Sequence, residues 1–253
     1  MMKEREKSCS VNNITLFENF FCFINIFYQS RIINYLRPLG LETVIDVGAH
    51  KGEFASSILK IKKIKNIFCF EPQIKINDIL VKKFSHIKKI KTFNCALDKV
   101  ISKKYIYINK LTSCSTLQTF NKKSFYLKFK NFLQGNKENY VRKYEVKTNT
   151  IDNIFKNKNF KKCLLKIDVE GYEINVLKGS KKTINNKIEY ILIENQFGNH
   201  YKKSSKVTIF DYLKNNNFKI LKKFTFPTLH FQDILFKKIN YTAPKQKGKF
   251  KIK

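Results

Sequence analysis

The stretch that decides the fold is TVIDVGAHKGEF, residues 43–54. Its first five residues are apolar or β-branched apart from Asp46, which is typical of a buried strand. Two of the chain's eight glycines, Gly48 and Gly52, then follow four residues apart. Glycine tolerates backbone conformations and close approaches that other residues resist. The stretch therefore predicts a strand, a sharp turn that lets backbone come near a ligand, and a helix.

The same alternation of strand and helix continues on the C-terminal side of this stretch. We expect strands at 43–47, 66–70, 90–97, 162–169, 187–194, 218–224 and 233–238, and helices near 52–62, 76–84, 171 onward and 207–215. Strands that alternate with helices favour a parallel sheet covered by helices on both faces. The fold class is accordingly α/β.

Three segments are expected along the chain. Residues 1–40 form an N-terminal helical extension, with a helix at 14–37 that the RPLG sequence ends. Residues 41–238 form the main domain, in which about 101–150 are an insertion placed over the carboxyl edge of the sheet, where open α/β folds bind ligands. Residues 239–253 are a basic tail that we expect to be frayed.

The composition excludes a disordered chain and argues against several partners. Hydrophobic residues make up 43% of the 253 residues, enough for a sizeable core. The net charge of +32 suggests an anionic partner, but only four basic residues are Arg, the residue that nucleic-acid readers favour. Six cysteines form no CxxC pair. We expect a cytoplasmic protein with lysines that mainly solubilise it.

The N-terminal helix is rich in phenylalanine on one face, formed by Phe17, Phe20, Phe21, Ile24 and Phe27. Its longest unbroken apolar run is too short to cross a bilayer, so we expect no transmembrane segment. Such a face packs on the core or on a second subunit, and the alternative is a helix that lies on a membrane surface. This face suggests a homodimer, and the family resemblance given below adds a partner in glycan synthesis.

The turn after the first strand has the spacing D-x-G-x-x-x-G, which differs from the dinucleotide motif G-x-G-x-x-G. Gly48 would let the backbone approach a ligand, and Gly52 would let the helix start close to the strand. The first N–H groups of the helix attract a carboxylate, and Asp46 attracts an ammonium group, directly or through water. S-adenosylmethionine carries both groups on an adenosine. The alternative is an ordinary strand–turn–helix corner.

Glu71 provides the second element of the predicted site. It ends the second strand in IFCFEP, 25 residues after Asp46. An acidic residue at this place holds the ribose hydroxyls of adenosine ligands. The alternative is an exposed glutamate in a loop.

Several motifs together resemble the FkbM family of S-adenosylmethionine-dependent methyltransferases over about residues 42–237. They are, in order, DVGAHKG, FEP, CAL, TIDNIF, LLKIDVEGYEINVLKG and IEYILIEN. The resemblance implies a class I methyltransferase (Rossmann-like) fold with a seven-stranded, mostly parallel sheet, helices on both faces and an antiparallel last strand. It also implies O-methylation of sugars and natural products. His50 departs from the Asn of many members.

The resemblance also implies roles for particular residues. Asp46, Gly48 and Gly52 match the turn at the methionine end of the cofactor, and Glu71 matches the ribose carboxylate. Residues 94–97, with Ala96 as a cofactor-binding residue, match the wall of the adenine pocket. Cys95 suits that wall and suits plain core packing equally well.

The KIDVEGYE motif follows the predicted strand at 162–169 and supplies the catalytic candidates. Asp168 would orient the acceptor hydroxyl and accept its proton, with Glu170 as a helper. Both residues could instead stabilise the start of the next helix. His200 is another candidate base, and residues 112–116, TSCST, would offer hydroxyls to the acceptor or form a polar turn.

We therefore predict an enzyme that transfers a methyl group from S-adenosylmethionine to a hydroxyl of a sugar, a glycan or a related small molecule. One alternative is an RNA methyltransferase, and another is a non-catalytic binding protein that keeps the fold. Asp168, Glu170 and Glu194 could together bind Mg²⁺, but no metal is expected because no further ligand is evident.

Overall fold

A computed structural model describes residues 24–108, 115–118, 142–196, 208–227 and 231–239. The chain divides into two units, Met1–Leu39 and Gly40–Lys253. In the first unit, residues 24–36 are helical and the 3₁₀ helix η1, Arg37–Leu39, follows. The rest of the helix predicted at 14–37 lies outside the described residues, as does the basic tail from residue 240. No helix in the described ranges has the length and apolar character needed to cross a membrane.

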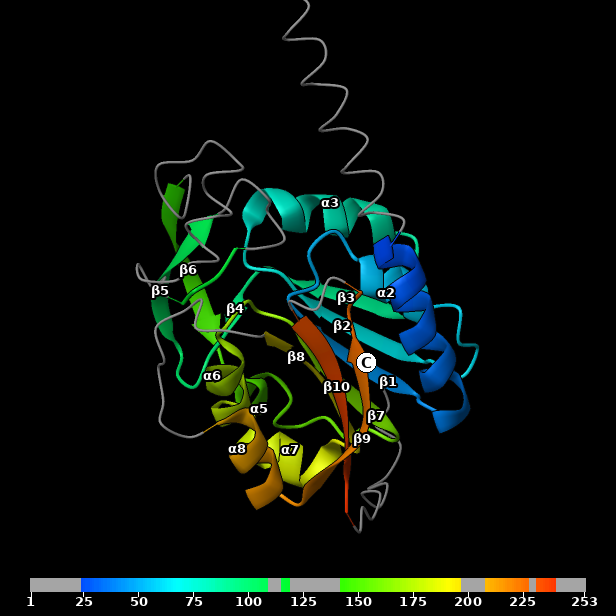
Figure 1. The fold of residues 1–253 in the computed structure, drawn as a ribbon. Coiled ribbons are helices and arrows are strands. Elements are labelled where there is room, and N and C mark those ends of the chain that lie inside the picture. The colour runs from blue at the N-terminus through cyan, green and yellow to red at the C-terminus, as the bar shows by residue number, and fades with distance from the viewer. Residues whose placement is uncertain (1–23, 109–114, 119–141, 197–207, 228–230, 240–253) are drawn as a thin grey trace, which may run out of the picture. The chain divides into compact units, whose positions relative to one another are not determined.

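The second unit is built on a seven-stranded sheet with the strand order β3-β2-β1-β7-β8-β10-β9 (Figure 1). The first five strands of this order pair in parallel, and β10 is antiparallel to both of its neighbours. The predicted fold class is thereby confirmed. The strands are β1 (Thr43–Val47), β2 (Asn66–Phe70), β3 (Ile90–Phe93), β7 (Cys163–Ile167), β8 (Tyr190–Gln196), β9 (Phe218–Thr225) and β10 (Phe231–Lys238).

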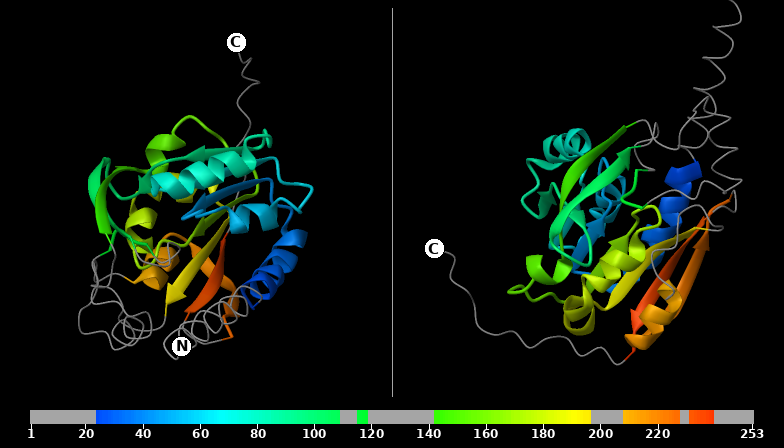
Figure 2. Two further views of the ribbon diagram at one scale, coloured as in Figure 1. Left: turned by 90° about the horizontal axis from the view of Figure 1, so that it is seen from above. Right: turned by 90° about the vertical axis from the view of Figure 1, so that its left-hand side faces the viewer.

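Helices cover both faces of this sheet (Figures 1 and 2). One face carries α2 (Glu53–Ile58) and α3 (Ile74–Phe84), and the other carries α5 (Ile151–Ile154), α6 (Glu173–Lys178), α7 (Lys181–Lys187) and α8 (Ile209–Asn215). A hydrophobic cluster of buried residues joins the sheet to α5–α8. Within it, the rings of Phe68 and Phe155 meet edge to face at 5.0 Å between centroids, and Phe70 stacks on Phe93 at 4.7 Å.

The central strands β1 and β7 are buried along their whole length. Strands of a parallel sheet that is covered on both faces are expected to be apolar throughout. Each strand nevertheless carries one charged residue, Asp46 in β1 and Lys166 in β7, and the two are partners in the parallel register. This pair places two opposite charges side by side in the middle of the sheet.

A smaller second sheet contains β4 (Ala96–Leu97), β5 (Ser102–Ile108) and β6 (Arg142–Asn149) in the order β4-β6-β5. The run at 90–97, predicted as a single strand, is therefore two strands that belong to different sheets. The side-chain amide of Asn94 donates to the carbonyl oxygens of Glu71 at 2.9 Å and Pro72 at 3.2 Å. These bonds hold the chain at the point where it leaves the first sheet.

The second sheet is tied to the main domain by a buried polar cluster. Asp98 is fully buried, and its carboxylate lies 2.6 Å from the Lys104 ammonium and accepts from the Tyr172 hydroxyl at 2.9 Å. Lys104 belongs to β5, whereas Tyr172 precedes α6. Thr116, from the same inserted segment, donates to the carbonyl oxygen of Glu170 at 2.7 Å. The described part of the insertion is thus fixed beside the carboxyl end of β7.

Candidate functional site

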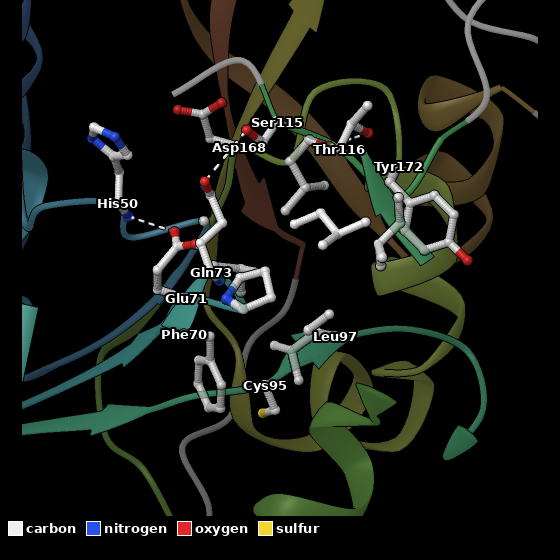
Figure 3. Close-up of a pocket in the computed structure, with 17 residues that line it drawn as sticks. His50, Phe70, Glu71, Gln73, Cys95, Leu97, Ser115, Thr116, Asp168 and Tyr172 are labelled. Carbon is white, nitrogen blue, oxygen red and sulfur yellow. Dashed lines mark hydrogen bonds between the residues drawn. The ribbon is translucent and has the colours of Figure 1, made fainter. Parts of the chain in front are cut away.

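A cavity opens at the carboxyl ends of β1, β2 and β7 (Figure 3). One side is formed by the turn after β1 and the loop after β2, and the opposite side by residues that follow β7. The second sheet contributes β4, Ile106 of β5 and residues 115–117. Open α/β sheets bind ligands at this edge, and every predicted site residue comes from a segment that ends or begins near it.

The turn after β1 is shaped by contacts on both of its sides. The amides of Gly48 and Ala49 donate to the carbonyl oxygen of Phe70, at 3.1 and 3.0 Å. His50 adopts a left-handed backbone conformation, with φ of 48°, and its amide donates to Glu71 at 3.0 Å. The Glu71 carboxylate thus stabilises a backbone conformation that a histidine rarely adopts.

Gly48 lines the cavity and has no room for a side chain. Its φ is 79°, and an added Cβ would lie 1.9 Å from the carbonyl oxygen of Asp168. Only glycine lets the β1 turn and the β7 loop approach this closely. The two chain segments that meet in the cavity are therefore in backbone contact.

Replacing Gly48 with alanine is expected to destabilise the protein by about 3 kcal/mol or more, because the strain of a positive φ adds to a clash with backbone. Gly40→Ala is the matched control, since Gly40 has a φ of 69° but nothing within 4 Å of the added Cβ. That variant is expected to lose only about 1 kcal/mol. Urea unfolding of both variants measures the difference, and equal losses would contradict the close approach.

Glu71 is the carboxylate of the β2 side of the cavity. It is 3% exposed, and its two oxygens accept from the amides of His50 at 3.0 Å and Gln73 at 2.9 Å. Burial raises the pKa of Glu71, although both amides oppose this. A carboxylate has roughly four lone-pair positions, so these two bonds leave acceptor capacity for a ligand with hydroxyl groups.

The wall beside Glu71 is apolar. Ala96 and Leu97 of β4, with Cys95 and Phe70, line this part of the cavity. Burial raises the pKa of Cys95 to about 11, so it remains a neutral thiol at neutral pH. An apolar wall next to a buried carboxylate suits a flat ring attached to a sugar.

Two of the predicted cofactor residues, Asp46 and Gly52, do not line the cavity. Asp46 is fully buried, and its carboxylate lies 3.3 Å from the Lys166 ammonium. Burial raises the pKa of Asp46, and Lys166 opposes this. A Cβ added to Gly52 would lie 2.3 Å from the Phe84 ring, so this position is crowded by α3. The predicted contact of Asp46 with the ligand stays a prediction.

Asp168 and Glu170 differ in their placement. Asp168 lines the cavity, its side chain is 36% exposed, and its Oδ2 lies 3.2 Å from the Lys166 ammonium. Glu170 does not line the cavity; its carboxylate accepts from the Gln196 amide. Asp168 is therefore the better placed of the two to contact an acceptor, because only Asp168 lines the cavity.

Further carboxylates surround this part of the sheet edge. Burial, then the nearby charges of Asp168, Glu170 and Asp233, raise the pKa of Glu194 well above its ordinary value. Burial also raises the pKa of Glu173 to about 7, although it accepts from the amide of Gly171. Within the described ranges, no three His, Cys, Asp or Glu side chains are arranged to hold a metal ion.

Among the polar residues in or beside the cavity, Lys166, Tyr172 and Gln73 were not predicted from the sequence. The available signal for Lys166 was a single charge inside the apolar strand CLLKI. Tyr172 lines the cavity from the start of α6, and Gln73 accepts from the Ser115 hydroxyl at 3.4 Å (Figure 3). Of the predicted acceptor segment 112–116, Ser115 and Thr116 line the cavity, whereas 112–114, like His200, lie outside the described residues.

A family model described as the methyltransferase FkbM domain matches residues 46–220. This range includes the parallel strands β2, β3, β7 and β8 and the end of β1. The chain belongs to the FkbM methyltransferase family. This FkbM methyltransferase is an S-adenosylmethionine-dependent methyltransferase. No curated protein matches the chain at a significant level.

Solved structures similar to the FkbM methyltransferase have low sequence identity to it. The methyltransferase domain of bacterial CtHen1-C is 10% identical, with 85% of this chain and 98% of that chain covered and a TM-score of 0.48. Aeropyrum pernix fibrillarin, solved with natively bound S-adenosyl-L-methionine, is 11% identical, with 78% and 66% covered and a TM-score of 0.44. A Streptococcus agalactiae protein of the NADB-Rossmann superfamily is 12% identical, with 85% and 70% covered and a TM-score of 0.43.

The cavity of the FkbM methyltransferase fits its methyl donor on two observations. Glu71 is a buried carboxylate with acceptor capacity left, as a pair of ribose hydroxyls requires. The adjacent wall at Cys95, Ala96 and Leu97 is apolar, as an adenine ring requires. These groups lie on the same side of the cavity.

Proposed function

We propose that this FkbM methyltransferase methylates a hydroxyl group of a sugar, a glycan or a related small molecule. The observation that carries this proposal is the position of Asp168. Its partly exposed carboxylate lies in the same cavity as Glu71 but on the opposite side, after β7. A proton acceptor across the cavity from the cofactor groups is what transfer to an alcohol needs.

The cofactor would be held by the β1 and β2 sides of the cavity. Gly48 would bring backbone close to its amino-acid end, Glu71 would accept from the ribose hydroxyls, and Ala96 would contact the adenine. Asp46 would act on the ammonium group through water, since it lies beneath the cavity lining rather than in it. When bound, S-adenosylmethionine supplies a methyl group on a positively charged sulfur.

Asp168 would then perform two tasks. Its carboxylate accepts a hydrogen bond from the acceptor hydroxyl, which orients the oxygen, and it takes the proton as the new carbon–oxygen bond forms. Glu170 helps by adding negative charge nearby, and the Gln196 amide holds its carboxylate in place. The hydroxyl groups of Ser115 and Thr116 are in reach of the same cavity and suit a polyhydroxylated acceptor.

Methyl transfer from radiolabelled S-adenosylmethionine to fractionated pools tests this proposal. The pools are free and nucleotide-linked saccharides, glycolipid-derived glycans, and total RNA. We expect label in a saccharide fraction, in a product whose methyl group resists mild base as an ether does. Label in RNA alone would overturn the assignment of the acceptor in favour of an RNA methyltransferase. Cofactor binding without transfer to any pool would favour a non-catalytic binding protein.

A further inference from the structure

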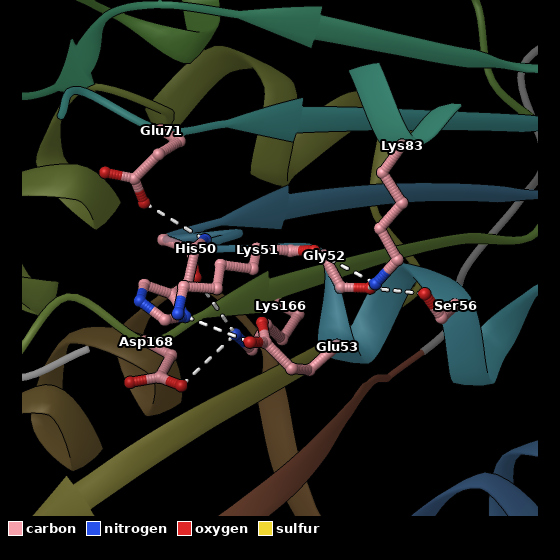
Figure 4. A network of polar contacts seen from close by, with 10 residues as sticks. His50, Lys51, Gly52, Glu53, Ser56, Glu71, Lys83, Lys166 and Asp168 are labelled. Atoms are coloured by element: carbon pink, nitrogen blue, oxygen red, sulfur yellow. Dashed lines mark hydrogen bonds and ion pairs between the residues drawn. The ribbon is translucent and has the colours of Figure 1, made fainter. Parts of the chain in front are cut away.

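Lys166 occupies an unusual place for a lysine. It lies in β7, at the centre of the sheet, and its side chain is 10% exposed (Figure 4). Its ammonium lies 3.3 Å from Asp46, 3.2 Å from Asp168 and 3.5 Å from the carbonyl oxygen of Gly48. The ammonium thus donates to the turn after β1 and lies within ion-pair distance of one carboxylate on β1 and one in the loop after β7.

This lysine is held in its charged form. Burial by itself would lower the pKa of Lys166, but the carboxylates of Asp168 and Asp46 outweigh burial and raise it. Lys166 is therefore a cation at neutral pH. It cannot serve as the proton acceptor, so any part that it has in the reaction must come from its charge and its three donors.

Lys166 does not need Asp168 to neutralise its charge inside the sheet. Asp46, fully buried and in register with Lys166, already neutralises the ammonium. Asp168 is partly exposed and belongs to the cavity. Lys166 engages its Oδ2, and Oδ1 has no hydrogen-bond partner in the described part of the chain. The ammonium therefore orients one oxygen of a cavity carboxylate and leaves the other for a ligand.

The same ammonium connects the two sides of the cavity. Through Gly48 it contacts the turn that approaches the donor, and through Asp168 it contacts the candidate base (Figure 4). The backbone of Gly48 and that of Asp168 are already so close that no Cβ fits between them. Methyl transfer is sensitive to the distance between the reacting groups, and a shared buried contact keeps that distance constant.

We propose that Lys166 is a positioning residue for methyl transfer: its ammonium fixes the Asp168 carboxylate relative to the donor turn at Gly48. This inference deepens the proposed function and rests on it. Removing the ammonium leaves Asp168 in the cavity but lets its side chain change rotamer. Turnover then falls while the cofactor groups at Glu71 and Ala96 remain in place.

Lys166→Met is the first test. We expect kcat to fall about 30-fold, with the dissociation constant for S-adenosylmethionine changed less than threefold. The other ionisable groups that interact with Lys166 remain in the variant: Asp46 on β1, Cys69 on β2 and Asp233 on β10. Glu173 and Glu194, which interact with Asp168, remain as well.

A double-mutant cycle with Asp168→Asn separates positioning from other roles. If Lys166 acts through Asp168, the double variant is no slower than Asp168→Asn alone. Lys166→Arg, which keeps the charge, should recover part of the lost turnover. Lys83→Met is the matched control, because Lys83 donates to the carbonyl oxygens of Lys51 and Gly52 in the same turn but does not contact Asp168. Its kcat should equal that of the wild type.

Wild-type kcat in Lys166→Met, or independent losses that multiply in the double variant, would overturn the proposal. If Lys166→Met does not fold, Asp46→Asn/Lys166→Met is compared with Asp46→Asn, since it removes both members of the buried pair. Carbon-13 chemical shifts of the Asp168 carboxyl, assigned with Asp168→Asn, report the Lys166 contact without an acceptor. A carboxyl resonance that Lys166→Met does not move refutes the contact, even if no acceptor is ever methylated.

Discussion

Asp168→Asn is expected to lower kcat about 1,000-fold, within the range that a positioned proton acceptor contributes. Asparagine keeps the size of the side chain and can still accept a hydrogen bond, but it cannot take the proton. The cofactor groups lie on the other side of the cavity, so the affinity for S-adenosylmethionine should change less than threefold. Steady-state kinetics with the acceptor saccharide, together with calorimetry, measures both quantities.

Two further variants make this result specific. Asp78→Asn removes an aspartate from the exposed face of α3 and should leave kcat unchanged. Glu170→Gln should cost only about tenfold, because Glu170 contacts Gln196 and lies outside the cavity lining. Wild-type kcat in Asp168→Asn would remove Asp168 as the base. A larger loss in Glu170→Gln than in Asp168→Asn would exchange their roles.

Glu71→Ala is expected to weaken the binding of S-adenosylmethionine about 100-fold. Hydrogen bonds to a charged group contribute about 1.5 kcal/mol or more each, and two ribose hydroxyls give about 3 kcal/mol, which corresponds to roughly 100-fold in affinity. The same change also removes the acceptor for the amides of His50 and Gln73. Isothermal calorimetry with S-adenosylmethionine and its thioether product measures the loss.

The controls for Glu71 lie close by. Glu71→Gln keeps one acceptor oxygen and should lose about tenfold in affinity. Glu53→Gln removes a carboxylate that accepts from the His50 ring at 3.1 Å but does not line the cavity, so the affinity should hardly change. An unchanged affinity in Glu71→Ala, with thermal unfolding that shows a folded variant, would refute the assignment of the ribose carboxylate.

The strands of the parallel sheet were readable from the sequence because a strand buried on both faces leaves a short, continuous apolar run. The predicted strands 43–47 and 66–70 agree with β1 and β2 residue for residue. Such runs are interrupted by few polar residues, and the glycines and prolines that follow mark their ends. The fold class needed no more than this alternation.

Elements that depend on contacts with distant parts of the chain could not be predicted from the local sequence pattern. The helix α7 has the sequence KKTINNK, which lacks an amphipathic pattern. Its first amides donate to the Asp152 carboxylate, at 2.9 Å from Lys182 and 2.7 Å from Thr183, and Asp152 lies about 30 residues earlier. The break at Asn94 likewise depends on carbonyl oxygens of another loop.

The residues of the candidate site likewise include some that the sequence pattern predicts and one that only a tertiary contact reveals. Gly48, Glu71, Ala96 and Asp168 could be predicted because each ends a strand or begins the next element, and all of them line the cavity. Lys166 could not, because a lysine in a lysine-rich chain indicates solvent, and only the strand register reveals its buried partner Asp46. The register also explains why Asp46 lies below the cavity rather than in it.

The pairing of β4 with β6 has a consequence for how acceptor choice can change in this protein. Leu97 lies opposite Asn149 in the register, and the Asp98 amide donates to the Asn149 carbonyl oxygen at 2.9 Å. Residues 98–149 thus begin and end at neighbouring positions. Replacing this segment with the corresponding segment of a relative would break no strand pairing of the seven-stranded sheet. If the proposed function holds, exchange of residues 98–149 between relatives should change which acceptor is methylated, while Gly48 and Glu71 stay in place.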